Sequence, residues 1–335
     1  MDLINYIQIT YKFKDLQVVN SLESEDRQNI RLLMLDSDKK LLFLKEKAFY
    51  LTQKDYLKNL QIQTKLNQKG MLVPKVLTTK NESMHLTWNG RSFIVQEWIT
   101  GKMLNPYNLS DLIDLGKLIA EFQKNASFIL YDEDIQQPYK HSSDGSIRSL
   151  NRMFEILHNV ALMTNQEYGM YDTFKKIKVW FQEQQLLVNF DKLLSSWVHG
   201  DIHSYNVIKD TTSKLIPIDL DDLHYGYSIA DLSWACIISS AWDWTFVSKQ
   251  LYLKKSLCRE SISQIIEGYE NNKNLSLDEM KSLPYFLGFA LINSFINVNS
   301  LFYCKHSTLP TNFNNQLDKI ISMLLDIERT YKYKK

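Results

Sequence analysis

The sequence lacks the features that define several broad classes of protein. It has only three cysteines, Cys236, Cys258 and Cys304, and no Cys-x-x-Cys pair, so we expect free thiols in a reducing compartment rather than disulfides. The formal net charge is only +1, which gives no field to hold a polyanion, so nucleic acid is not expected as a partner. No basic segment followed by an apolar one stands after Met1, so we expect no signal peptide and a cytoplasmic location.

Long apolar runs are also scarce. The run at 282–304 carries no charge and is long enough to span a bilayer. It contains Pro284, Asn293, Asn297 and Asn299, which hydrocarbon would penalise. We therefore predict a buried helix here and no membrane partner, with a membrane span as the alternative.

The chain has no internal repeat, and its 335 residues suit one large domain or two lobes. Short apolar runs at 17–20, 30–35 and 41–45, separated by polar turns, predict an antiparallel meander. A helix is predicted over 52–69, ended by Gly70, and a last strand of this sheet over 92–99. We predict a domain boundary after residue 101.

Helical periodicity predominates from residue 102 onward. Ser110 is predicted to cap a helix whose Leu112, Leu115, Ile119 and Phe122 form one apolar stripe. Further helices are predicted at about 148–163, 172–189, 229–240, 245–271, 277–303 and 312–331, with a long loop over 131–145. The predicted fold class is therefore α+β, with a β-rich part over 1–101 and a mainly helical part over 102–335.

Lys45 stands out within the β-rich part. In an extended strand, Leu41, Phe43 and Lys45 share one face. A buried ammonium is costly unless it meets an anion, so Lys45 is a candidate anion-binding residue. The alternative is an edge-strand lysine that reaches back to water.

The most informative stretch is Trp197-Val198-His199-Gly200-Asp201-Ile202-His203-Ser204-Tyr205-Asn206, followed by Ile216-Pro217-Ile218-Asp219. Phosphoryl transfer from ATP needs one carboxylate to accept the proton of an attacking hydroxyl. It also needs an asparagine and a second carboxylate to hold the magnesium ions that neutralise the phosphates. Asp201, Asn206 and Asp219 supply this set of side chains.

A metal hydrolase is the main alternative for the same stretch. His199, Asp201 and His203 alternate, and on a strand all three would share one face, as a metal site could use. However, the remaining histidines are scattered singly along the chain, and a kinase also accounts for Asn206 and Asp219.

These residues, with Ala230-Asp231-Leu232 downstream, resemble the aminoglycoside phosphotransferase and choline kinase superfamily, which includes homoserine-kinase-like and spore-coat kinase-like relatives. The resemblance runs from about residue 28 to about 300 and is most specific at 197–232. It implies a two-lobed protein-kinase-like fold, with a small antiparallel sheet in the N-terminal lobe, a larger helical C-terminal lobe, and ATP and Mg2+ as cofactors.

The resemblance also implies roles for individual residues. Asp201 would be the catalytic base, with His203 near the substrate, Asn206 and Asp219 would bind magnesium, and Lys45 would contact the α- and β-phosphates. The remaining implied roles are adenine binding by the backbone of Glu97, Trp98 and Ile99, bracing of the loop by His199, anchoring of the loop by Asp231, and a place in the phosphate-side loop for Asn29.

Two positions depart from the family pattern. The helix glutamate that normally pairs with the strand lysine has no clear equivalent, because the matching region offers Asn59, Gln61 and Gln63. Gln123 stands where relatives often have histidine. Reduced activity or another partner for Lys45 would account for these changes, as would drift.

The substrate is expected to be a small hydroxyl compound that bears an amine, such as an antibiotic, an amino alcohol or a sugar. Carboxylates with tryptophans suit a cation, and such side chains gather at Asp221, Asp222, Trp242, Asp243 and Trp244. The alternative is that they are solvated faces and core tryptophans. We predict an ATP-dependent phosphotransferase, with a weak or inactive spore-coat-type assembly protein as the alternative, and make no prediction of oligomeric state.

Overall fold

The computed structural model describes residues 1–22, 29–129, 151, 155–156, 167–245, 250–306 and 313–331. The chain forms two compact units, described separately below. Unit 1 comprises Met1–Met103 and Asn206–Leu223, and unit 2 comprises Leu104–Tyr205 and His224–Lys335. The predicted loop at 131–145 and nearly all of the predicted helix at 148–163 lie outside the described residues.

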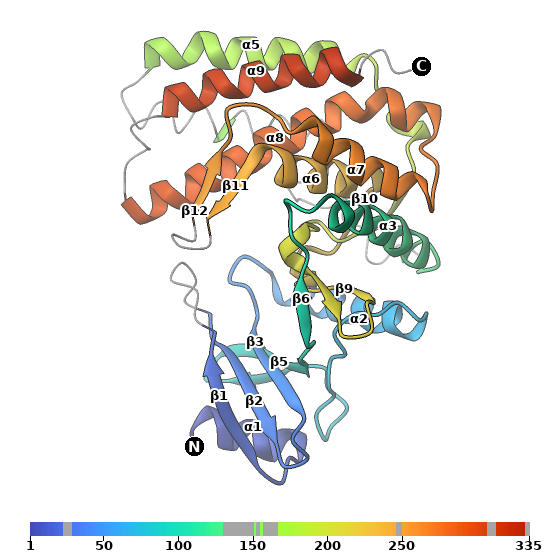
Figure 1. Cartoon of the computed structure of the whole chain (residues 1–335). Helices are drawn as coiled ribbons and strands as arrows, with labels where there is room; N and C mark the ends of the chain where they lie inside the picture. Colours follow the sequence, from blue (N-terminus) through green and yellow to red (C-terminus); the bar gives the residue numbers. More distant parts are fainter. Residues whose placement is uncertain are drawn as a thin grey trace. The chain divides into compact units, whose positions relative to one another are not determined.

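Unit 1 is built on a five-stranded sheet in the order β1-β2-β3-β5-β4 (Figure 1). Every neighbouring pair is antiparallel, which confirms the predicted meander of the first three strands. The strands are β1 (Leu16–Ser21), β2 (Arg31–Asp36), β3 (Leu41–Glu46), β4 (Leu86–Trp88) and β5 (Arg91–Glu97).

One helix covers each face of this sheet. The helix α1 (Leu3–Tyr11), which we did not predict, buries Leu3 and Ile7 against Leu42 and Leu44 of β3. The helix α2 (Gln53–Gln68) begins after Thr52, whose side chain accepts the Asp55 N–H, and its Tyr56 and Leu60 pack on Ile94.

Lys45 lies on the α2 face of the sheet. In an antiparallel pair, residues directly opposite each other point to the same side. Lys45 is opposite Ile94 in the β3–β5 register, and Ile94 packs against α2. The β3 strand lies inside the sheet between β2 and β5, so Lys45 is not an edge-strand lysine, and the alternative reading of this residue was wrong.

A second, three-stranded sheet brings 206–223 into unit 1. Its order is β6-β8-β9, with β6 (Gly101–Met103), β8 (Val207–Asp210) and β9 (Leu215–Pro217). A Cβ on Gly101 would come within 2.3 Å of the Lys209 carbonyl oxygen, so only glycine permits this close approach of β6 to β8. The division of the chain into domains at residue 101 stays a prediction.

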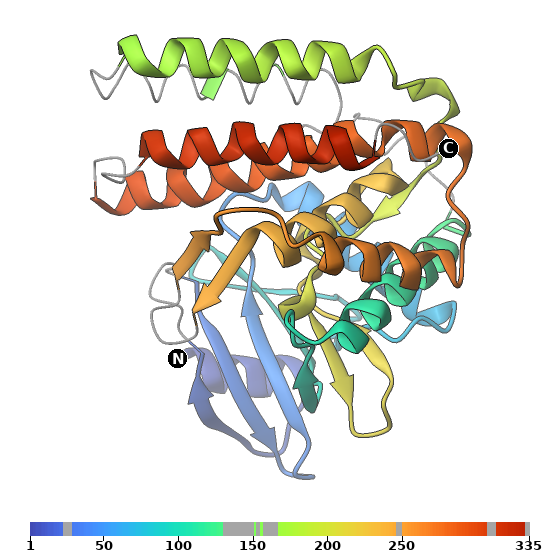
Figure 2. The same cartoon turned by 45° about the horizontal axis from the view of Figure 1, so that its top comes forward.

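Unit 2 is mainly helical, and the predicted α+β class holds for the whole chain. Figures 1 and 2 show α5 running beside α9, and α9 beside α8. Its helices are α3 (Leu109–Ala126), α5 (Glu167–Gln185), α6 (Ser228–Ala241), α7 (Arg259–Glu270), α8 (Leu277–His306) and α9 (Phe313–Tyr331). Its strands form the antiparallel pairs β7 (Ser195–Val198) with β10 (His224–Tyr227), and β11 (Trp242–Thr245) with β12 (Gln250–Leu253). Unit 2 has a short 3₁₀ turn at η2 (Phe190–Lys192). A second turn, η3 (Ser204–Asn206), lies where the chain passes into unit 1, and a third, η4 (Leu220–Asp222), belongs to unit 1.

Two local predictions in unit 2 were wrong. The cap of α3 is Asn108 rather than Ser110, since the Asn108 side chain accepts the N–H groups of Ser110 and Asp111. The helix predicted over 245–271 begins only at Arg259, because the chain first forms the β11–β12 hairpin. Aromatic and β-branched residues such as Trp242 and Thr245 favour strands, and this preference outweighed the helical spacing.

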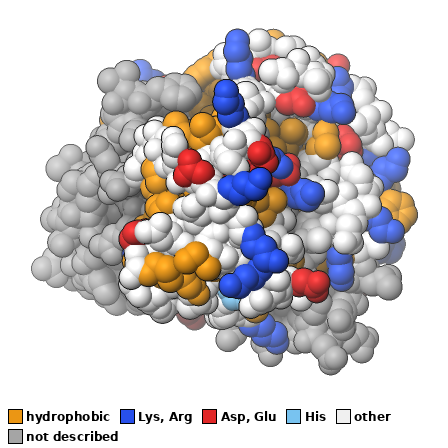
Figure 3. Space-filling view, turned by 90° about the horizontal axis from the view of Figure 1, so that it is seen from below, with side chains coloured by type: hydrophobic (Ala, Val, Ile, Leu, Met, Phe, Trp, Pro, Cys, Tyr) orange, Lys and Arg blue, Asp and Glu red, His pale blue; other side chains and the backbone are white. Residues whose placement is uncertain are grey.

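The uncharged run at 282–304 lies in α8, where residues 282–296 are all buried. This confirms the prediction of a buried helix. None of the helices in the described ranges is long and apolar enough to cross a membrane. The face seen in Figure 3 carries Lys, Arg, Asp and Glu side chains side by side.

Candidate active site

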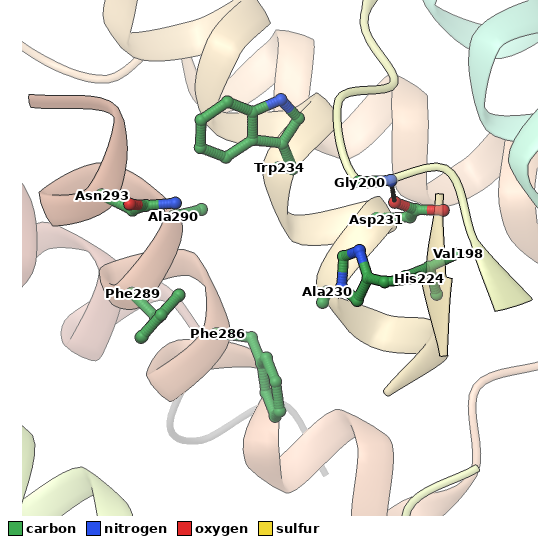
Figure 4. Close-up of a pocket in the computed structure, with 10 residues that line it drawn as sticks. All are labelled: Val198, Gly200, His224, Ala230, Asp231, Trp234, Phe286, Phe289, Ala290 and Asn293. Atoms are coloured by element: carbon green, nitrogen blue, oxygen red, sulfur yellow. Dashed lines mark hydrogen bonds between the residues drawn. The ribbon is translucent and has the colours of Figure 1, made fainter. Parts of the chain in front are cut away.

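The loop that follows β7 in unit 2 is pinned by a buried carboxylate. Asp231, in the first turn of α6, accepts the backbone N–H group of His199 at 2.8 Å. It also accepts that of Gly200 at 2.9 Å (Figure 4). Burial raises the pKa of the Asp231 carboxyl to about 6. Gly200 has φ of 84°, a conformation that favours glycine, so both the anchor and the turn are set by residue type.

His199 braces the same loop from within. Its side chain is fully buried, its ring lies 5.9 Å from that of Phe122, and its Nδ1 accepts the Asp201 N–H at 3.3 Å. The His199 backbone and imidazole therefore both restrict the path of the chain into Asp201.

Asp201 is oriented by a tryptophan that the sequence reading missed. The indole Nε1 of Trp234 donates to Asp201 Oδ1 at 2.9 Å, and His203 Nε2 lies 3.6 Å from the same oxygen. Trp234 follows Asp231 by three residues on α6, so the two share one face of that helix. That spacing was the signal available in the sequence.

The geometry does not support the metal-hydrolase reading. Residues 199–203 follow β7 as an irregular loop rather than a strand, so His199, Asp201 and His203 do not alternate across one face. His199 Nδ1 is engaged by the Asp201 N–H, and His203 Nδ1 by the Tyr205 N–H at 3.3 Å. Among the described residues, no group of three His, Cys, Asp or Glu side chains could hold a metal.

In unit 1, Asn206 and Asp219 stand at the open end of the β8–β9 hairpin. The Ile218 N–H donates to the Asn206 carbonyl at 2.8 Å, which holds the two strand ends together. Asp219 adopts the left-handed conformation, with φ of 60° and ψ of 57°, which aspartate tolerates better than most residues. An amide oxygen and a carboxylate are ligands that suit a hard cation such as Mg2+.

Lys45 meets two carboxylates. Its Nζ lies 2.5 Å from Asp219 Oδ1 and 2.8 Å from Asp221 Oδ1. Burial by itself would lower the pKa of the Lys45 ammonium, but the charges of Asp219 and Asp221 outweigh it and the pKa is raised. Lys45 therefore stays charged, as a lysine that binds an anion must.

The α2 helix presents two amide side chains near Lys45, those of Asn59 and Gln63. Asn59 Nδ2 donates to the main-chain oxygen of Asp221 at 2.5 Å, and Gln63 Nε2 donates to the Pro74 oxygen at 2.6 Å. Gln61 is exposed. The carboxylate partners of Lys45 come instead from the segment after β9.

Arg31 is a second cation that the sequence reading missed. It stands directly opposite Lys45 in the β2–β3 register, and its Nη2 lies 4.0 Å from Asp219 Oδ2. Asn29 lies just before β2. The pairing of Arg31 with Lys45 depends on the register between two strands, which a local sequence pattern does not show. The sequence therefore contained no signal for Arg31.

The predicted adenine-binding segment leaves β5. The N–H groups of Glu97 and Trp98 donate to Lys75 and Leu41 oxygens at 2.9 and 3.1 Å. The Glu97 carboxylate pairs with Lys40 Nζ at 2.6 Å.

The residues predicted for the substrate divide between unit 1 (Asp221 and Asp222) and unit 2 (Trp242, Asp243 and Trp244). Trp242 is a core residue, 1% exposed, whose indole N–H donates to Ser294 Oγ at 2.9 Å, so it cannot offer its face to a cation. Asp221 is held against Lys45, and Asp222 accepts the Tyr50 hydroxyl at 3.2 Å. The Trp244 side chain lies outside the described residues.

Asp243, in unit 2, keeps an exposed carboxylate. It accepts the Tyr107 hydroxyl at 2.7 Å. Tyr205, at the end of the Asp201 loop, has its pKa raised to about 12, first by burial and further by Tyr107 and Asp243. Asp243 therefore lies close to this loop.

Gln123 joins three helices of unit 2. Its Nε2 donates to the Ser228 oxygen at 2.6 Å, and its Oε1 accepts from Tyr269 Oη at 2.7 Å and Lys273 Nζ at 3.0 Å. The side chain is 2% exposed. Glutamine at this position, where the family often has histidine, therefore has a structural role as a buried link between helices.

Residues 29–252 match the phosphotransferase enzyme family. The chain belongs to this family. The match covers more than half of the phosphotransferase chain and includes the 197–219 stretch, whose residues predict phosphoryl transfer. A comparison with curated proteins finds no match.

Solved structures share the phosphotransferase fold over nearly the whole chain. An aminoglycoside phosphotransferase from Alicyclobacillus acidocaldarius is 11% identical with a TM-score of 0.67, and covers 99% of this chain and 97% of its own. The amicoumacin kinase hAmiN, in complex with AMP-PNP, Ca2+ and Ami, is 15% identical with a TM-score of 0.68 (99% and 94% covered). A microcompartment-associated aminopropanol kinase is 13% identical with a TM-score of 0.67 (99% of both chains).

Together, these comparisons confirm the resemblance to the aminoglycoside phosphotransferase and choline kinase superfamily. They also confirm the predicted α+β kinase-like fold.

Proposed function

We propose that this phosphotransferase moves the γ-phosphoryl group of ATP to a hydroxyl of a small, amine-bearing molecule. The observation that carries the proposal is the buried Lys45, held 2.5 Å from Asp219, because phosphoryl transfer needs a lysine and a carboxylate side by side at the triphosphate. The two residues are 174 positions apart in the chain, so their contact is a product of the fold.

Asn206 and Asp219 would hold magnesium, since their side chains offer the oxygen ligands that it prefers. The metal would neutralise charge on the phosphates. Lys45 would bind the α- and β-phosphates, and Arg31, opposite it, would add a second positive charge. Because the N–H groups of Glu97 and Trp98 already donate to the Lys75 and Leu41 oxygens, we assign the adenine-binding N–H to Ile99.

Asp201 would accept the proton of the acceptor hydroxyl. The hydroxyl oxygen forms a bond to the γ-phosphorus, the bond from that phosphorus to the bridging oxygen breaks, and ADP leaves. Trp234 donates to Oδ1 of Asp201 and so orients the carboxylate that would accept this proton. Rate enhancement then comes from positioning and charge neutralisation. His203 lies beside Asp201 and would contact the acceptor.

The amine of the acceptor is proposed to bind near Asp243. That carboxylate is exposed and close to the loop of Asp201, with Tyr107 and Tyr205 beside it. The name of one structural relative, an aminopropanol kinase, supports an amine-bearing acceptor. A location in the cytoplasm stays a prediction.

The alternative of an inactive assembly protein arose because α2 lacks a glutamate for Lys45. The contact of Lys45 with Asp221 removes that reason, so we favour the kinase.

The proposal is tested with a panel of amino alcohols, aminoglycosides and sugars, assayed for ATP consumption that depends on the acceptor. At least one amine-bearing compound should stimulate turnover, and Asp201→Ala should abolish it while ATP binding, followed by thermal shift, is kept. An Asp201→Ala protein with the native rate would overturn the assignment, as would a native protein whose melting temperature ATP and Mg2+ leave unchanged.

A further inference from the structure

Lys45 has a carboxylate partner, Asp221, in the 3₁₀ turn η4 rather than on the α2 helix. Four residues of the α2 helix line a small cavity of about 10 Å3 with Lys45 and Asp221, and two of these, Asn59 and Gln63, have polar amide side chains. Neither can supply a negative charge. Every anion within salt-bridge distance of Lys45 in the described residues comes from the segment 219–221.

Asp221 is the deeper of the two anions. Its side chain is 12% exposed, against 25% for Asp219. Its Oδ1 contacts Lys45, and its Oδ2 is buried with no hydrogen-bond partner among the described residues. Asp219 is different, because it also faces Arg31 and is the proposed magnesium ligand. Lys45 is therefore the dedicated partner of Asp221.

The α2 helix holds Asp221 through its backbone. Asn59 Nδ2 donates to the Asp221 carbonyl oxygen at 2.5 Å, within the 3₁₀ turn η4. The side chain of Asp221 is thereby directed at Lys45 by a fixed main chain. A carboxylate that is hydrogen-bonded to an ammonium is a stronger partner than an amide.

We propose that Asp221 is the positioning residue for Lys45 and takes the place of a helix carboxylate in this chain. This inference rests on the proposed function. Once Asp219 binds magnesium, its charge is shared with the metal, and Asp221 is left to hold the ammonium toward the phosphates. The α2 helix then acts on Lys45 through the hydrogen bond from the Asn59 amide to Asp221.

The test begins with Asp221→Asn, which keeps the size and removes the charge. Losing one charge-assisted hydrogen bond of about 1.5–3 kcal/mol should raise the ATP dissociation constant, measured by calorimetry without an acceptor, about 10- to 100-fold. The KM for ATP should rise in parallel, and the KM for the acceptor should stay within about twofold. Asp210→Asn is the matched control, because Asp210 is the last residue of β8, at the opposite end of that strand from Asn206, and accepts the Lys214 N–H; this variant should bind ATP as the native protein does.

A variant that moves the carboxylate to another element tests whether Asp221 positions Lys45 or only stabilises the fold. Asn59→Glu combined with Asp221→Asn moves the carboxylate from η4 to α2 and should recover at least about tenfold of the lost ATP affinity. Adding Asp221→Asn to Lys45→Met should cause no further loss, since the lysine through which Asp221 acts is absent.

Two results would overturn the inference while leaving the proposed function standing. One is native-like ATP affinity in Asp221→Asn, and the other is an additional loss of affinity when Asp221→Asn is added to Lys45→Met. Failure of the native protein to bind ATP would instead remove the proposed function itself.

Discussion

The indole nitrogen of Trp234 lies 2.9 Å from Oδ1 of Asp201 and donates a hydrogen bond to it. Trp234 sits on α6 three residues after Asp231, whose carboxylate pins the backbone of the preceding loop at His199 and Gly200. One helix therefore fixes both the path of the loop and the orientation of its central carboxylate.

Trp234→Phe should lower kcat about tenfold with little change in the KM for ATP. The substitution keeps the ring and removes the donor to Asp201, whose hydrogen bond to a charged group is worth about 1.5–3 kcal/mol. Steady-state kinetics with both substrates varied would measure this. Trp180→Phe is the matched control, because the Trp180 indole nitrogen is buried with no hydrogen-bond partner among the described residues. Equal effects of the two substitutions on kcat would contradict the role of Trp234.

Arg31→Ala should raise the KM for ATP about five- to tenfold and leave the KM for the acceptor unchanged. Arg31 stands opposite Lys45 and faces Asp219, so its loss removes positive charge from the proposed phosphate site. Arg259→Ala is the control, since Arg259 forms an exposed ion pair with Asp326 in unit 2. An unchanged KM for ATP in Arg31→Ala would refute the prediction.

Gln123→Leu should destabilise unit 2 by about 2–4 kcal/mol, because it leaves the Ser228 oxygen and the Tyr269 hydroxyl buried without a partner. Urea denaturation followed by tryptophan fluorescence would measure the loss. Gln264→Leu, which removes only an exposed hydrogen bond to Glu267, should change stability by less than about 0.5 kcal/mol. A Gln123→Leu protein as stable as Gln264→Leu would show that the link adds no stability.

Asp231 should make stability depend on pH in an unusual direction. Burial raises the pKa of its carboxyl to about 6 from the ordinary 3.8, so the folded state binds a proton that the unfolded chain has already released. Its contribution is fully present below about pH 4 and is lost as the pH rises through about 6, with a magnitude on the order of 3 kcal/mol.

The check compares the native protein with Asp231→Asn across this range. The thermal unfolding midpoint of the native protein minus that of Asp231→Asn should decrease as the pH rises from 4 to 7. The Asp231 carboxyl carbon should titrate near pH 6 by NMR. A carboxyl that titrates below pH 4 would contradict the prediction.

Much of the fold was open to prediction from local pattern. The strands at 31–36 and 41–46, the helix after Thr52 and the helix at 313–331 were found because alternation, capping residues and helical spacing are properties of a few consecutive residues. The hairpin of Trp242 was missed because strand preference and helical spacing compete there, and its antiparallel pairing with β12 decided the outcome.

The candidate site divides in the same way. The residue types at Asp201, Asn206 and Asp219 and their spacing were sufficient to indicate phosphoryl transfer, and the family match bears out a phosphotransferase. Tertiary structure alone brought Asp221 to Lys45, Trp234 to Asp201, and Trp242 into the core. Sequence determines which charges and donors a chain carries, but a buried charge is stable only beside its partner, and which partner that is depends on strand register and on contacts between residues far apart along the chain.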